Sequence, residues 1–221
     1  MKKLLLTICV AAVTAGAFAQ SINYGIRAGM NWSTQTFSAP GSVTYTNLTG
    51  FHAGVVADLG IHQFSIQPGL YFITKGFGSY YSYPLPENSS SSNSSTTIKR
   101  NIRLNYLELP VNLLYHVKLS PTMNLYFGGG PYIAYGISGK AINYPNAYSP
   151  TKSEGDVTFG TGFLDSYRAP DYGVNFLIGQ HIKHFTIDIN YSLGLADISL
   201  DGPYNKVHNR SFGASVGYWI K

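Results

Sequence analysis

Four ionisable residues lie inside segments that otherwise alternate between apolar and small polar side chains: Arg27, Asp58, Glu108 and Asp188. A charge in such a setting must be paired or must reach water, because an isolated buried ion is costly. Arg27 can bridge one or two of the three carboxylates. Such a group of charges either lines a path for ions or holds strands in register. The structural role is favoured if the strands enclose a space narrow enough for side chains to fill.

The sequence gives only weak support for a hydrolytic site. His52 and His208 are potential general bases, and Ser166, Asp165 and Asp171 could complete a serine–histidine–acid set, but no nucleophile motif supports it. The chain has no helical HExxH motif, and the run "FGGGPY" is not followed by the Gly-Lys-Ser/Thr of a phosphate-binding loop. We therefore expect a protein that is not an enzyme and that uses no metal or cofactor.

The first 19 residues have the form of a secretory signal peptide. Two lysines precede an apolar run, and the small-x-small triplet "AFA" predicts cleavage after Ala19. Residues 20–221 then form the mature domain, whose formal charge falls from +5 to +3 with the loss of the two lysines. The single cysteine, Cys9, is lost too, so no disulfide is expected. The other basic residues are scattered, which argues against nucleic-acid binding.

The mature chain alternates apolar and polar residues in eight segments, as β-strands do. These segments cover about residues 21–32, 50–60, 63–77, 101–118, 122–139, 170–182, 184–196 and 209–220. No apolar run approaches the roughly 20 residues of a membrane helix, whereas a membrane-spanning strand needs only about 9–11. The pattern therefore predicts an all-β protein.

The connections between these segments alternate between long and short. The short ones contain "IHQ", "LSPT" and "HIKH", and the long ones cover residues 33–49, 78–100, 140–169 and 197–208. In an up-and-down meander all short turns then lie at one end, as in outer-membrane barrels with short periplasmic turns and long extracellular loops. An even number of strands places both termini in the periplasm. Within 140–169 there is room for a short hairpin.

The two faces of each segment indicate which solvent they meet. In "FTIDINYSLG" one parity is apolar and the other carries Thr, Asp, Asn and Ser, and elsewhere the second face is mostly Gly, Ser and Asn. Such residues make a poor water-facing surface but fit the crowded interior of a narrow barrel. We therefore expect an eight-stranded antiparallel transmembrane barrel with its apolar face against lipid. Aromatic side chains near strand ends predict an interfacial girdle of Trp32, Tyr115, Tyr126, Tyr191, Tyr218 and Trp219.

Two motifs carry a resemblance to a known family. One is the run Tyr106, Leu107, Glu108, Leu109 and Pro110, and the other is a glycine-rich segment led by Asp171 that includes Gly173. The chain resembles the PorT-like, more broadly OmpA-like, outer-membrane β-barrels of Bacteroidetes-type bacteria. The resemblance implies an integral outer-membrane protein and no particular chemistry. Pro110 in a central strand also predicts a bulge there, because proline cannot donate to the ladder.

Three functions fit this reading. The first is a barrel with a side-chain-filled lumen that serves as a structural or interaction protein through its extracellular loops. The second is a small-solute or ion pore, and the third is a soluble exported barrel that binds an apolar ligand. For the first we expect contacts with outer-membrane lipid, with the barrel-assembly machinery and with an unidentified extracellular or periplasmic protein, but not with nucleic acid.

Overall fold

The computed structural model describes residues 21–37, 44–84, 95–146, 149–160, 162, 166–200 and 206–220, so the expected signal peptide lies outside them. Nine strands make up one antiparallel sheet within these ranges. Their bounds are β1 (Ser21–Phe37), β2 (Thr44–Ile61), β3 (Phe64–Pro84), β4 (Ser95–Ser120), β5 (Met123–Asn143), β6 (Ser153–Val157), β7 (Pro170–Ile182), β8 (Phe185–Gly194) and β9 (Val207–Trp219). No helix in the described part of the chain is long and apolar enough to cross a membrane.

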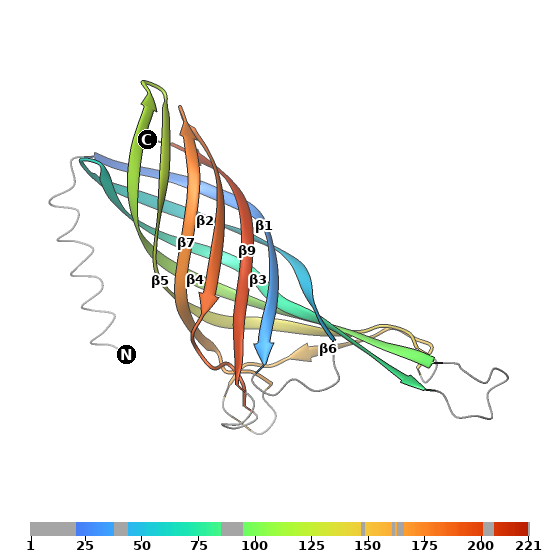
Figure 1. Cartoon of the computed structure of the whole chain (residues 1–221). Helices are drawn as coiled ribbons and strands as arrows, with labels where there is room; N and C mark the ends of the chain where they lie inside the picture. Colours follow the sequence, from blue (N-terminus) through green and yellow to red (C-terminus); the bar gives the residue numbers. More distant parts are fainter. Residues whose placement is uncertain are drawn as a thin grey trace.

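The sheet closes on itself to form an up-and-down barrel (Figure 1). β1 pairs with both β2 and β9, and β4 pairs with β5, so the wall is continuous. The expectation of eight strands is corrected to nine by β6, which pairs with β5 alone. β6 lies in the 140–169 segment, where the sequence left room for a hairpin, and it occupies the edge of β5 beyond the end of β7.

The three short connections are tight turns at one end of the barrel. Ile61 pairs with Phe64 across one turn, and Ile182 pairs with Phe185 across another. The first residue of each turn, His62 and Lys183, has a positive φ of 58° and 55°. Positive φ is the conformation that tight primed hairpin turns require. The expected placement of the short turns is therefore confirmed.

The strands are longer than expected at the opposite end. β3 and β4 remain paired as far as Pro84 and Ser95, well into the segment expected to be a loop. Figure 1 shows this hairpin reaching away from the other strands. In "GFGSYYSYP" apolar and polar residues no longer alternate clearly, because the two faces of the hairpin are not divided between lipid and the barrel interior there. The strand predicted from alternation therefore ended several residues before β3 does. The expected long loops are accordingly shorter.

The apolar parity faces outward. Val55, Phe185 and Val216 are 56%, 61% and 61% exposed, while the interior carries Asn, Ser, Gln and charged side chains. A water-soluble fold would reverse this arrangement. The predicted orientation of the two faces is therefore confirmed along the described strands.

Pro110 does not produce the expected bulge. β3 and β4 keep one register from Pro68–Val111 to Tyr71–Glu108, on either side of the proline. The pairing of β4 with β5 shifts register elsewhere, between Asn105 and Tyr106 and between Lys118 and Ser120. Pro110 is tolerated because an antiparallel strand can lose one ladder hydrogen bond without changing its register.

Candidate functional site

The interior of the barrel contains three successive polar layers. The layer nearest the short turns is built around Asp58, which accepts hydrogen bonds from Ser65 Oγ at 2.8 Å and from Gln67 Nε2 at 3.1 Å. His116 Nε2 lies 2.8 Å from the same Ser65 hydroxyl. The carboxylate is thus held by neutral donors on β3, next to its own strand β2.

The middle layer holds an ion pair. Arg27 Nε lies 3.3 Å from Asp188 Oδ2, and both side chains are almost fully buried. Tyr126 donates its hydroxyl to the same carboxylate oxygen at 3.2 Å. His52 Nε2 of β2 lies 2.8 Å from Ser215 Oγ of β9, across Gly29 of the intervening strand β1. This layer therefore links strands from opposite sides of the barrel.

The third layer lies toward the long-loop end and is centred on Lys75. Its Nζ lies 2.7 Å from Glu108 Oε2 and 3.4 Å from Asp171 Oδ2, and the lysine side chain is only 1% exposed. The same ammonium sits 4.4 Å from the centroid of the Tyr132 ring, a cation–π contact. Asn209 Nδ2 donates to Asp171 Oδ2 at 2.9 Å. One cation therefore serves two buried carboxylates.

The four ionisable residues singled out in the sequence are all buried in this interior, but they do not form one cluster. Arg27 meets Asp188 and not the other acids, and Asp58 relies on Ser65 and Gln67. Glu108 has Lys75, which the sequence analysis missed. The alternation along β3 could have identified Lys75 as an inward residue. It lies an even number of residues from Gln67, Tyr71 and Ile73, which also point inward.

The predicted aromatic girdle is wrong at two positions. Tyr126 and Trp219 are 2% and 6% exposed and point into the barrel. Each falls on the inward parity of its strand, alternating with the outward Phe127 or Tyr218. The other four predicted members lie at least partly on the outer surface: Trp32, Tyr115, Tyr191 and Tyr218.

The family-motif residues divide between the two faces. Tyr106, Glu108 and Pro110 are buried, whereas Leu107 and Leu109 are exposed on the outer surface. Asp171 lies in the third layer rather than at the rim. Gly173 is buried two residues further along β7, where a Cβ would lie 2.8 Å from the Tyr132 ring. Gly173 thus leaves room for the inward ring of Tyr132 on the neighbouring strand β5.

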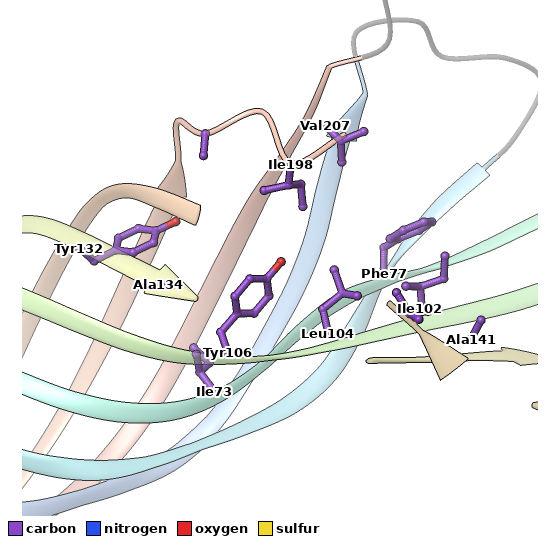
Figure 2. Close-up of a cluster of buried hydrophobic side chains, with 12 residues drawn as sticks. Ile73, Phe77, Ile102, Leu104, Tyr106, Tyr132, Ala134, Ala141, Ile198 and Val207 are labelled. Carbon is purple, nitrogen blue, oxygen red and sulfur yellow. The ribbon is translucent and has the colours of Figure 1, made fainter. Parts of the chain in front are cut away.

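An apolar cluster covers the third layer at the long-loop end (Figure 2). Leu104 and Tyr106 of β4 belong to it, and Ile198 and Val207 face them from the other side of the opening. The backbone N–H of Ile198 donates to Val207 O, and Phe159 packs edge-on against Tyr106 at 5.6 Å. Segments from two connections therefore fold into the mouth of the barrel and close it with apolar side chains.

Small spaces lie between the inner layers formed by the described residues. A cavity of about 50 Å³ lies beside Arg27, His52 and Asp188, and another of about 30 Å³ lies beside Asp58 and Tyr126. A water needs about 10–15 Å³ measured in this way. These cavities are therefore large enough for a few waters each. The space at the short-turn mouth is larger, about 410 Å³, and His62, His116 and His181 line it.

The described residues do not assemble the catalytic set considered above. Asp171 is committed to Lys75 and Asn209, and His208 Nδ1 lies 2.8 Å from the backbone oxygen of Ala196. His52 lies within the barrel rather than near its long-loop end, and Asp165 lies outside the described residues. No group of three or more histidine, cysteine or acidic side chains in the described ranges has the geometry to hold a metal ion.

Comparison with known proteins identifies the architecture. A family profile described as "Outer membrane protein beta-barrel domain" matches residues 18–200. Ail of Yersinia pestis, solved with the heparin analogue sucrose octasulfate, is 11% identical with a TM-score of 0.40, covering 91% of this chain and 100% of Ail. Neisserial surface protein A is 11% identical with a TM-score of 0.44, covering 90% and 99%. No curated protein sequence matches the chain.

Proposed function

The chain belongs to the outer-membrane β-barrel domain family, and on that premise we propose that it is a sealed barrel that acts through its long-loop end. The observation that carries this proposal is the filled lumen. Three layers of bonded polar side chains and an apolar cluster occupy the interior, and the inner cavities are about 50 and 30 Å³. A solute larger than water cannot cross such an interior without rearranging a buried ion pair.

The long-loop end offers material for an interaction. The β3–β4 hairpin extends beyond the other strands and carries an exposed Tyr80, with Lys99 and Arg100 opposite on β4. Tyrosine and arginine are enriched where proteins bind one another. We assign the interaction role to this end, with an unidentified extracellular protein as the partner, whereas a periplasmic partner would bind at the short turns.

The lengths of the connections give the orientation of the barrel in the membrane. In barrels of the bacterial outer membrane short turns face the periplasm, so both termini are assigned to the periplasm and the long loops to the exterior. Eight strands would then cross the lipid, and β6 would lie outside it. As part of the same proposal, the chain belongs to the PorT-like subfamily, contacts outer-membrane lipid and is inserted by the barrel-assembly machinery.

Bilayer conductance tests the sealed lumen. Protein reconstituted in a planar bilayer should show no steady current under conditions in which an open porin conducts. A steady, ion-selective current would contradict the proposal. Heat-modified mobility of the same sample on a gel confirms that the barrel is folded and inserted.

Cysteine labelling tests the orientation. The chain's single cysteine lies in the expected signal peptide, so Ser149→Cys and Thr122→Cys each place one thiol at an exposed position, in the β5–β6 connection and in a short turn. A membrane-impermeant maleimide should label Ser149→Cys on intact cells and Thr122→Cys only after lysis. The reverse pattern would invert the barrel.

A small ion pore is the second candidate, favoured by one observation. Most of the residues that line the cavity beside Arg27 and Asp188 are polar, and the cavity lies within the barrel. If this path conducts, Glu108→Ala or Asp188→Ala will change the conductance. The soluble-barrel alternative is wrong, because the apolar side chains face outward and the chain belongs to an outer-membrane family.

A further inference from the structure

The outer wall carries basic side chains just beyond its apolar band at the long-loop end. On β9 an aromatic row ends the band: Phe212 pairs with Trp32 of β1 and with Tyr191 of β8, and all three are exposed. The next outward residue along β9 is Arg210, which is also exposed. Two residues of strand correspond to about 7 Å, so the guanidinium follows the aromatic row directly.

The same order occurs on β4 and β5. Leu107 and Tyr135 form an exposed apolar pair. Four residues nearer the long-loop end of β4, the exposed Arg103 pairs with Lys140. Four residues span about 13 Å of strand, which at a tilt of about 40° is roughly 10 Å along the membrane normal. Arg103, Lys140 and Arg210 will be called the basic collar.

Lys140 lies opposite Arg103 of β4 on one side and opposite Asp156 of β6 on the other, so its contact with Arg103 is the one between like charges. Like charges directly opposite each other on neighbouring strands are destabilising. Lys140 lies 3.9 Å from Glu154, but that carboxylate is only 2.7 Å from Lys152, whose hydrogen bond holds the pKa of Glu154 below its usual value. Arg103 and Arg210 form no ion pair with any side chain that the structure describes.

The height of the collar matches one ligand class. Headgroups extend about 5–8 Å beyond the hydrocarbon on each side of a bilayer, and the long side chains of arginine and lysine reach across that distance. Guanidinium binds phosphate with two parallel hydrogen bonds. We infer that the basic collar binds the phosphate groups of anionic lipid in the outer leaflet, with Arg103 and Arg210, which have no acidic partner among the described side chains, as the main phosphate ligands. This inference rests on the proposed function, because it requires the long-loop end to face outward.

The test compares two charge-matched double variants. R103Q/R210Q removes two collar cations, and K118Q/K183Q removes two exposed lysines at the short-turn end. Each protein is titrated, in neutral detergent micelles, with diphosphorylated lipid A, monophosphorylated lipid A and phosphatidylcholine, and the complexes are counted by native mass spectrometry. Each cation near anionic lipid contributes about fivefold, so R103Q/R210Q should weaken binding of the diphosphorylated lipid by roughly 30-fold. K118Q/K183Q should bind it like the unaltered protein.

Several outcomes would overturn the inference. If both double variants lose affinity for diphosphorylated lipid A equally, the binding depends on the net charge of the protein and not on the collar. Equal binding of diphosphorylated lipid A and of the zwitterionic phosphatidylcholine would show that the protein does not select lipids by their net negative charge. Soluble tripolyphosphate that binds with the same dependence on Arg103 and Arg210 would point to a soluble polyanion. The gel-mobility shift of each sample reports folding and insertion, so a folded barrel without lipid preference refutes the collar alone and leaves the sealed barrel standing.

Discussion

Lys75 Nζ lies 2.7 Å from the carboxylate of Glu108, and both groups are sealed in the interior of the barrel. Asp171 approaches the same ammonium from the other side at 3.4 Å. The single positive charge of the lysine lies next to both carboxylates and offsets their mutual repulsion in a medium of low dielectric constant. Its removal should cost far more than the loss of one surface ion pair.

Lys75→Met is expected to lower the free energy of unfolding by about 3–5 kcal/mol, because it leaves two uncompensated buried carboxylates. The measurement is a urea titration of vesicle-inserted protein, followed by gel mobility. The triple variant Lys75→Met/Glu108→Gln/Asp171→Asn, which removes all three charges, should recover part of the loss. The exposed Lys118→Met is the control. A Lys75→Met barrel as stable as the control would contradict the buried triad.

The Arg27–Asp188 pair should behave as an energetic unit. A double-mutant cycle with Arg27→Met and Asp188→Asn is expected to give a coupling of about 0.5–3 kcal/mol, as residues in direct contact do. The comparison cycle pairs Arg27→Met with Asp58→Asn. Asp58 is bonded to Ser65 and Gln67, so its coupling to Arg27 should be smaller. If the two couplings are equal, the middle layer does not have the pairing described.

The two tryptophans of the chain should report opposite environments. Trp32 is 38% exposed on the outer wall and stacks on Phe212, whereas Trp219 is 6% exposed and faces the interior. In vesicles of brominated lipid the fluorescence of Trp219→Phe, which retains Trp32, should be quenched strongly. Trp32→Phe should be quenched only weakly. Strong quenching of Trp219 would place that side chain in the girdle after all.

Gly136 should control how the 140–169 segment packs on the barrel. A Cβ at this position would lie 2.4 Å from the Phe159 ring, and its three nearest atoms all belong to that ring. Gly136→Ala should displace Phe159 from Tyr106 and cost about 1–3 kcal/mol. Trypsin should then cleave after the exposed Lys152 more rapidly than in the unaltered barrel. Gly155→Ala, with nothing within 4 Å of the added Cβ, is the matched control. Identical cleavage rates would show that this packing does not hold the segment.

Local pattern determined the architecture of this protein. Period-2 alternation assigned each strand two faces, and the scarcity of charge on either face indicated lipid outside and a crowded interior. The lengths of the connections placed the short turns at one end. The same parity would have placed Tyr126, Trp219 and Lys75 inside, had it been followed strictly at those positions.

Tertiary structure alone decided which charges meet. Lys75 and Asp171 are 96 residues apart in the chain and come together only when the sheet closes on itself. Arg27 could have paired with any of three acids, and the register of β1, β8 and β9 selected Asp188. The extension of β3 and β4 was likewise not predictable from the sequence, and for β6 the sequence left room for a hairpin without predicting its pairing with β5. Where a strand pair extends beyond the membrane and the barrel interior, its two faces need not differ in polarity. The pairing then leaves little alternation in the sequence, because backbone hydrogen bonds need no particular side chain.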